Sequence, residues 1–300
     1  MNADLTPEKL KELKLKANDV RRLIIEALDG ANHNTGSGHT GGPLGMADIF
    51  TALYFHLLKH DPKNPDNPNR DRLLLSNGHI CAVLYASLAL SGYFPTEELK
   101  TFRGFETRLQ GHPHRGVLPG IENTSGPLGE GLSQAIGIAL ARNLDKKEYT
   151  VFVATSDGEH QEGNVWEAAM FAGKLKLSRF IQIIDYNNMQ IDGNVEDIMP
   201  LEPFRAKYEA FNWHAIDVDG NDIKAVIDAV TEAQSVQHKP VIIIAHTVPG
   251  KGVSYMENNY KWHGMPPGLK DVEGAPPKEE QVKKAFEEIK AERDRIINEG

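Results

Sequence analysis

Two polar runs follow apolar, strand-length segments and could together hold a metal ion. Asp157 follows the apolar run at 149–155, and Asn187 follows the run at 180–184. Their separation of about 30 residues is a natural length for one strand–helix–strand crossover. Because ligands of parallel α/β sheets bind at the carboxyl ends of the strands, the carboxylate and the amide are expected to meet there. Such hard oxygen ligands suit Mg²⁺ or Ca²⁺, with open positions left for phosphate oxygens.

The same residues have a simpler interpretation, since Asp-Gly after a strand is usually only a turn. The presence of Asn187, one strand–helix–strand crossover later, favours a metal site over a simple turn. A calcium-binding EF-hand loop is excluded, because Glu162 stands where that loop needs its glycine and no glutamate closes it.

Four histidines lie on glycine-containing segments: His39, His79, His112 and His263. A lone histidine is usually structural, but four on such loops indicate a cluster that hydrogen-bonds hydroxyl groups and phosphate oxygens. A zinc site built from the same histidines stays open, although no close paired spacing such as His-Glu-x-x-His supports it.

A glycine-rich segment at 126–131 could cradle phosphate groups. It lacks the Lys-Ser/Thr of a P-loop, and its glycine spacing is wrong for a dinucleotide fingerprint. Taken alone, it indicates a tight turn with close backbone packing.

The elements that must position these residues alternate between strands and helices. Apolar, β-branched runs of strand length lie at 149–155, 180–184, 214–218 and 241–245, with a shorter run at 72–76. Helical patterns lie at 165–174, 203–211 and 223–234, and further helices are expected from Pro7 to before Gly30, at 43–58, up to Leu90, and around 135–141. This alternation predicts an α/β fold, a doubly wound and mostly parallel sheet with helices on both faces.

The domain organisation is expected to be simple. Residues 1–270 are predicted to form one domain, and residues 271–300 a charged C-terminal tail or linker helix. The tail has only Val282, Phe286 and Ile289 as an apolar stripe. It is therefore interpreted as a solvated helix, or as a linker that docks on something outside this chain.

Composition narrows the class of protein. The chain has 300 residues, of which 40% are hydrophobic and 25% charged, with a formal net charge of −9. No basic patch stands out, so a nucleic-acid partner is not expected. The single cysteine, Cys81, fits a reducing compartment. With neither a signal-like start nor a membrane-length apolar stretch, the sequence predicts a cytoplasmic protein with no membrane partner.

The motifs, in this order along the chain, resemble those of the transketolase family. The residues that carry the resemblance are Ser37-Gly38-His39, Ser76-Asn77-Gly78-His79, Gly111-His112-Pro113, Gly126-Pro127-Leu128-Gly129, Asp157-Gly158 with Asn187, Asp219-Gly220-Asn221-Asp222 and Trp262-His263-Gly264. They run from the first helix to about Gly268. The resemblance implies the diphosphate-binding domain of a thiamine-diphosphate enzyme.

The resemblance also implies a role for each site residue. Asp157 and Asn187 would bind Mg²⁺ (with Ca²⁺ or Mn²⁺ as alternatives) through their side chains, and Met189 through its backbone carbonyl. His79, Gly158 and His263 would contact the diphosphate, and Gly126 and Leu128 would lie against the aminopyrimidine. His39, His112 and His263 would line the sugar channel as catalytic residues. Glu162 and Glu167 would lie at the interface between subunits.

Three positions depart from the family's pattern. Ser156 replaces the first glycine of the usual Gly-Asp-Gly, and Thr40 replaces a common proline in the first histidine loop. Asn188 stands where many relatives have glycine. Asparagine is the next best residue at positive φ, so a left-handed turn is expected at that position.

Members of the family carry three domains, of which this sequence matches the first. The resemblance therefore implies the N-terminal subunit of a split transketolase, which transfers a two-carbon ketol unit between sugar phosphates. Its partners would be a C-terminal subunit with the pyrimidine-binding domain and a second copy of this chain, giving a heterotetramer. The alternatives are a deoxyxylulose-phosphate-synthase-like or other specialised sugar ketol transferase, the α-type subunit of a 2-oxoacid dehydrogenase, and a non-catalytic binding subunit. The loops at His39, His112 and His263 argue against the dehydrogenase.

Overall fold

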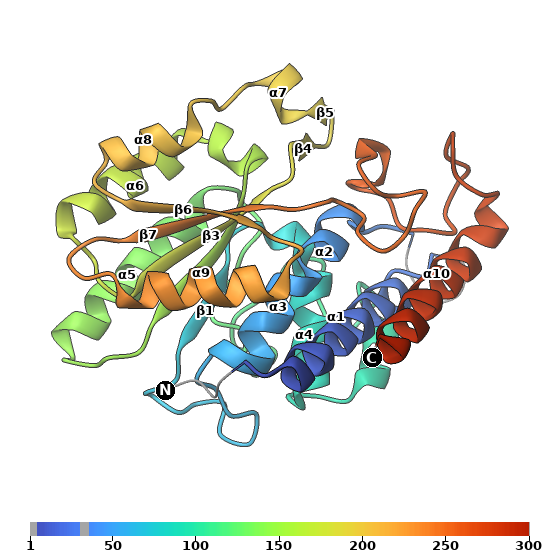
Figure 1. Ribbon diagram of the computed structural model, residues 1–300, viewed down its shortest axis with the longest axis horizontal. Coiled ribbons are helices and arrows are strands. Elements are labelled where there is room, and N and C mark those ends of the chain that lie inside the picture. The colour runs from blue at the N-terminus through green and yellow to red at the C-terminus, as the bar shows by residue number, and fades with distance from the viewer. Residues whose placement is uncertain (1–4, 31–35, 300) are drawn as a thin grey trace.

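Five parallel strands form the central sheet of the structure, a computed structural model that describes residues 5–30 and 36–299 (Figure 1). In sheet order these strands are β1 (Arg72–Leu75), β2 (Val151–Ser156), β3 (Phe180–Tyr186), β7 (Val241–His246) and β6 (His214–Asp219). Every neighbouring pair is parallel. The predicted strands and the predicted fold class are confirmed.

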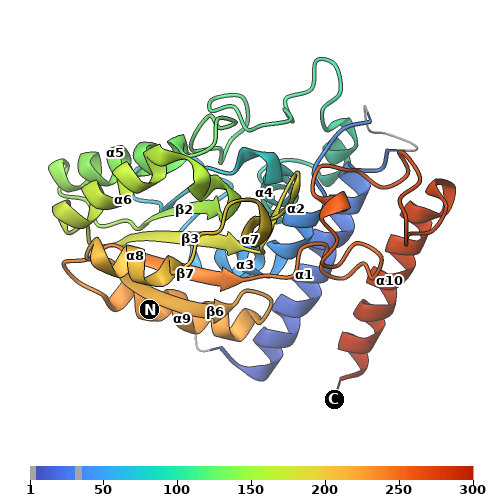
Figure 2. The ribbon, with the colours of Figure 1, turned by 90° about the horizontal axis from the view of Figure 1, so that it is seen from above.

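Side chains of successive strand residues enter two different cores, one on each face of the sheet. In β2, Val151 and Val153 face one core, whereas Phe152 and Ala154 face the other. The first core lies under α5 (Glu130–Leu144), α6 (Gly163–Leu175) and α8 (Phe204–Ala210). The second lies under α1 (Pro7–Ala27), α3 (Ala47–Ala52), α4 (Cys81–Ser91) and α9 (Ile223–Ser235), as Figure 2 shows. Burial on both faces explains why the strands are apolar almost throughout.

The first helix begins as the sequence predicts. Thr6 caps α1, since its Oγ1 accepts a hydrogen bond from the Lys9 N–H at 3.2 Å, and Pro7 occupies the first turn. The single helix expected at 43–58 is instead divided into α2 (Gly41–Gly45), α3 and a π-helical turn at Leu53–Leu57. The first break in the helix comes directly after Gly45, where an added Cβ would lie only 3.0 Å from the Val248 carbonyl oxygen. Glycines here let the backbone approach the end of the sheet closely.

The C-terminal tail forms α10 (Lys278–Asn298), but it docks on this chain. Ile289 is buried in the core shared with α1, and Val282 and Phe286 pack against that core. The Asn18 Nδ2 of α1 donates a hydrogen bond to the Ile289 carbonyl at 2.9 Å. The expectation of a tail that is solvated or docks elsewhere is therefore wrong, because α1 provides the apolar surface that a narrow stripe needs.

Short elements gather after the carboxyl ends of the strands. The 3-10 turns Gly78–Ile80 and Gly158–Gln161 follow β1 and β2, and the hairpin of β4 (Met189–Gln190) and β5 (Gly193–Asn194) follows β3. α7 (Val195–Ile198) continues the hairpin, and a 3-10 turn at Tyr260–Trp262 comes after β7 in the chain. A further 3-10 turn, Thr96–Thr101, comes instead after α4 and packs against α1 and α4. Among the described residues, no helix is both long and apolar enough to cross a membrane.

Candidate active site

Two buried carboxylates lie side by side at the ends of β2 and β3. Asp185 is paired in register with Ser156, the residue before Asp157. The Asp157 carboxylate accepts hydrogen bonds from the backbone N–H groups of Gly158, at 2.7 Å, and Asn188. The Asp185 carboxylate accepts from the Thr247 hydroxyl and, at 2.9 Å, from the Asn187 amide.

Burial makes the ionised form of both carboxyl groups unfavourable. It raises the pKa of Asp157 to about 8, with the nearby charge of Asp185 as the second cause. Burial likewise raises the pKa of Asp185 to about 7. A divalent cation beside them would compensate the negative charge that the surrounding protein does not. The pair therefore fits a cation site.

The other predicted metal ligands converge on the same place. The Asn187 Oδ1 accepts from the Met189 N–H at 2.8 Å, which folds the chain tightly after β3. A Cβ placed on Gly158 would lie 3.9 Å from the Met189 carbonyl oxygen. Asn188 has a φ of +55°, so the expected left-handed turn is confirmed. Carboxylate, amide and carbonyl oxygens thus lie close together, which is a donor set suited to Mg²⁺ or Ca²⁺.

Three of the four predicted histidines are in ring contact with one another. The ring centroids of His39 and His79 are 4.9 Å apart, those of His39 and His263 5.4 Å, and those of His79 and His263 5.3 Å. His112 lies at the edge of this cluster, where a Cβ placed on Gly126 would be 3.6 Å from its Cγ. Segments more than 200 residues apart in the sequence, those of His39 and His263, are therefore brought together.

Burial keeps the clustered imidazoles neutral. It lowers the pKa of His39 to about 3, helped by the neighbouring His263, Arg103 and His112, and lowers the pKa of His263 to about 4. Burial is also the main cause that lowers the pKa of His79 and of His112. Neutral imidazoles can accept hydrogen bonds as well as donate them.

Several buried polar atoms around the cluster have no hydrogen-bond partner among the described residues. They include the Nδ1 atoms of His39 and His263 and both side-chain polar atoms of Asn77. Buried polar atoms are nearly always satisfied in folded proteins, so a polar ligand or water is expected here. These atoms fit the diphosphate and hydroxyl groups that the sequence motifs predict.

The histidine loop and the carboxylate pair form one continuous site. A Cβ placed on Gly42 would lie 3.6 Å from the Asp185 Oδ2, and one on Gly41 would lie 3.7 Å from the Met189 Sδ. Thr40, which replaces a common proline, donates a hydrogen bond from its hydroxyl to the Met265 carbonyl at 2.6 Å. The threonine therefore ties the first histidine loop to the segment that follows His263.

The glycine-rich segment is held by Glu159, a residue that the sequence interpretation did not single out. Its buried Oε1 accepts hydrogen bonds from the Gly129 N–H, at 2.6 Å, and from the Ser76 hydroxyl. Its Oε2 accepts from the Ser156 N–H at 3.2 Å. Glu159 thus joins the ends of β1 and β2 to the start of α5, and the same glycine-rich segment brings Gly126 against His112. Its position two residues after Asp157 was the only signal for it.

The two predicted interface residues lie at the surface. Glu162 precedes α6 and Glu167 lies on its second turn, and both are exposed. In the part of the chain that the structure describes, neither carboxylate has a hydrogen-bond or ion-pair partner. Their predicted role at a subunit interface stays a prediction.

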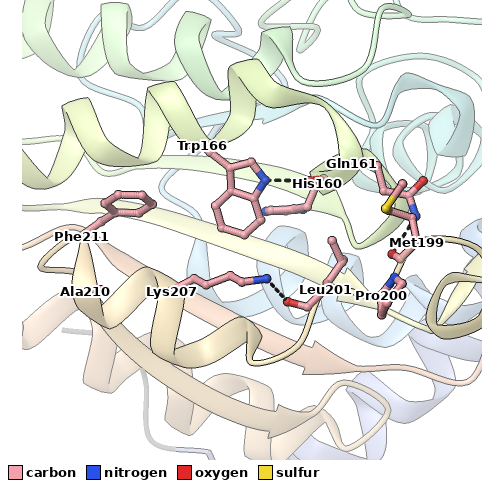
Figure 3. Close-up of a pocket in the computed structure, with 9 residues that line it drawn as sticks. All are labelled: His160, Gln161, Trp166, Met199, Pro200, Leu201, Lys207, Ala210 and Phe211. Atoms are coloured by element: carbon pink, nitrogen blue, oxygen red, sulfur yellow. Dashed lines mark hydrogen bonds between the residues drawn. The ribbon is translucent and has the colours of Figure 1, made fainter.

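A separate pocket of about 530 Å³ opens between α6 and α8 (Figure 3). Its wall is mainly apolar, with Trp166, Leu201 and Phe211 among the lining residues. The two basic groups in the wall are already engaged. The buried His160 contacts the Ser156 carbonyl and the Tyr208 hydroxyl, and the Lys207 ammonium donates to the Leu201 carbonyl. None of the predicted site residues lines this pocket, so we do not assign the active site to it.

The parallel sheet and the polar groups at its strand ends define an α/β protein of the thiamine-diphosphate-binding class. Residues 13–295 match the family described as the thiamine diphosphate binding domain of transketolase. The chain belongs to the transketolase family, and the resemblance of its motifs is confirmed.

Similar proteins include both separate subunits and whole transketolases. The chain is 44% identical to a 6-deoxy-6-sulfo-D-fructose transketolase subunit of a Clostridium species, over 85% of this chain and 91% of that one. It is 37% identical to an apulose-4-phosphate transketolase subunit of Phocaeicola vulgatus, over 89% and 93%. The solved transketolase of Leishmania mexicana superposes with a TM-score of 0.79 and 31% identity, over 96% of this chain and 46% of that one. The chain thus spans about half the length of this solved relative and nearly the whole of the separate subunits.

Proposed function

We propose that this chain is the N-terminal subunit of a two-chain transketolase, which transfers a two-carbon ketol unit from a ketose phosphate to an aldose phosphate. The observation that carries the proposal is the contact among the rings of His39, His79 and His263, where the His39 loop also approaches Asp185 and Met189. The match in length to separately made transketolase subunits supports the two-chain arrangement.

Thiamine diphosphate, when bound, supplies the ylid that attacks the ketose and holds the two-carbon fragment. In the proposal, Asp157, Asn187 and the Met189 carbonyl hold a divalent metal, with Mg²⁺ preferred. His79, Gly158 and His263 contact the diphosphate. Gly126 and Leu128 lie against the aminopyrimidine, where the open backbone of Gly126, at a φ of +150°, leaves room for a flat ring.

His39, His112 and His263 are proposed to contact the sugar. A neutral imidazole can accept a hydrogen bond or proton from a sugar hydroxyl and return it to the carbonyl. The lowered pKa values of His39 and His263 support their role as hydrogen-bond acceptors for a sugar hydroxyl, because a protonated ring could only donate.

The partners are proposed to be a C-terminal subunit with the pyrimidine-binding domain and a second copy of this chain, giving a heterotetramer. Large apolar side chains are exposed on α6 within about one turn of Glu167 and support a contact there: Met170 and Phe171 are 56% and 44% exposed. Exposed apolar groups of this kind often mark protein interfaces. A cytoplasmic location remains a prediction from composition.

The function is tested by mixing the chain with a candidate C-terminal subunit, thiamine diphosphate and Mg²⁺. We expect two-carbon transfer from a ketose phosphate to an aldose phosphate, measured by product analysis. A 6-sulfonated ketose serves as a second donor, because one of the similar subunits is named for such a sugar. Decarboxylation of a 2-oxoacid without ketol transfer would contradict the proposal, as would cofactor binding with no turnover of any ketose.

Replacement of two histidines by alanine is expected to separate binding from catalysis. His112→Ala should lower kcat/KM for ketol transfer by about 10²-fold or more, while cofactor affinity changes little, because His112 lies at the edge of the cluster. His263→Ala should lower both kcat/KM and cofactor affinity, because that ring contacts the rings of both His39 and His79. Titration calorimetry with the cofactor and steady-state kinetics measure the two effects. Equal losses of cofactor affinity in the two variants would contradict the assignment.

A further inference from the structure

Arg103 connects the two loops that carry His39 and His112. Its Nη1 donates a hydrogen bond to the Ser37 hydroxyl at 3.0 Å, two residues before His39. Its Nη2 donates to the Gly111 carbonyl at 3.2 Å, directly before His112. A Cβ on Gly111 would lie 3.0 Å from the Arg103 Cζ, so the glycine makes room for the guanidinium.

The Arg103 guanidinium has few other partners. Within residues 5–30 and 36–299, no carboxylate lies within ion-pairing distance of Arg103, and its buried Nε has no hydrogen-bond partner. By contrast, Arg108, five residues later, forms an ion pair with Glu98, in which its Nη2 donates a hydrogen bond to the Glu98 Oε2 at 2.9 Å. Arg103 also has a φ of +60°, a conformation that only a few per cent of non-glycine residues adopt. A residue held in this way is a candidate for a specific role.

The charge of Arg103 reaches both histidines. After burial, it is among the causes that lower the pKa of His39, together with His263 and His112, and it is the second cause for His112. His79 also faces His39, at a ring distance of 4.9 Å. Arg103 therefore acts on the rings of His39 and His112 in two ways: through its hydrogen bonds to the neighbouring Ser37 hydroxyl and Gly111 carbonyl, and through its positive charge.

We propose that Arg103 is a positioning residue for ketol transfer, which ties the His39 loop to the His112 loop and fixes the spacing of the two imidazoles. This inference rests on the proposed function. The planar guanidinium suits the task because it can reach two acceptors in different directions at once, whereas a lysine ammonium is a single point on a flexible stem. Misplacement of reacting groups by about 1 Å can cost about 10²-fold in rate.

The test compares Arg103→Lys with Arg108→Lys in the assembled two-chain enzyme. We expect Arg103→Lys to lower kcat for ketol transfer by about 10- to 100-fold. Cofactor affinity and Tm should stay near those of the parent, because the metal ligands lie elsewhere. The control Arg108→Lys should behave like the parent in all three measurements. Ser37→Ala should lower kcat by a smaller factor. Adding Ser37→Ala to Arg103→Lys should lower kcat little further, because both substitutions remove the same Arg103–Ser37 hydrogen bond.

A second readout separates positioning from a purely structural role. Arg103→Met removes the charge as well as the connection, which raises the pKa of His39 and His112. The acid limb of the kcat/KM profile should therefore move to higher pH in Arg103→Met than in Arg103→Lys. Parent-like kcat in Arg103→Lys, fully additive losses with Ser37→Ala, or a loss confined to phosphorylated sugars would each overturn the inference. An inactive parent enzyme would instead refute the proposed function.

Discussion

Asp157→Asn is expected to abolish metal-dependent binding of thiamine diphosphate while the fold survives. The carboxylate lies at the end of β2 beside Asp185, and the asparagine variant removes its charge but keeps an oxygen for the Gly158 N–H. We expect cofactor affinity in the presence of Mg²⁺ to fall by more than about 100-fold, because loss of an outer-shell partner alone typically costs roughly 10- to 100-fold. Titration calorimetry with and without Mg²⁺ measures the effect.

The matched control is Asp228→Asn, which changes an exposed carboxylate of α9 that pairs with Lys224. It should leave cofactor affinity unchanged. In the parent chain, metal affinity should fall as the pH is lowered through about 8 and 7, because protons then compete for Asp157 and Asp185. Parent-like binding by Asp157→Asn, with metal dependence retained, would show that the metal site is assigned wrongly.

The sequence allowed the sheet and the strand-end site to be predicted because both depend on local pattern. A buried parallel strand is apolar throughout, and a polar residue directly after it lies at a known edge of the sheet. Asp157, Asn187 and the glycine-flanked histidines could therefore be found one by one. Their convergence at ring distances of 4.9 to 5.4 Å could not be measured from the sequence, but the order of the motifs indicated it.

Residues that act through long-range contacts were missed. Glu159 joins Ser76, Gly129 and Ser156, and Arg103 joins Ser37 to Gly111, but no local pattern distinguishes either from a surface charge. The docking of α10 was mispredicted for the same reason. The apolar stripe of α10 is narrow, and its sequence does not indicate that α1 packs beside it.

The chain alone is expected to have no transketolase activity. Thiamine chemistry needs a carboxylate against the aminopyrimidine to shift the cofactor to the form that loses its thiazolium proton. The carboxylates at the strand ends are already engaged: Asp157 and Asp185 beside the predicted metal site, and Glu159 on Ser76, Gly129 and Ser156. Glu162 and Glu167 are exposed at the start of α6. Because three of these five carboxylates are engaged and the other two are exposed on α6, we expect none of them to act on the aminopyrimidine, which in the proposal lies beside Gly126 and Leu128.

A second polypeptide should therefore supply that carboxylate and close the cofactor between the chains. Permanent interfaces of this kind commonly bury more than roughly 2,000 Å². The isolated chain should leave such a surface exposed and self-associate, most simply as a two-fold dimer, which light scattering can measure. With cofactor, Mg²⁺ and a ketose–aldose pair it should still bind the cofactor but turn over nothing, and activity should arise only when the C-terminal subunit is added. Robust turnover by the chain free of any second polypeptide would refute the two-chain assignment, because one of its own carboxylates would then have to activate the cofactor.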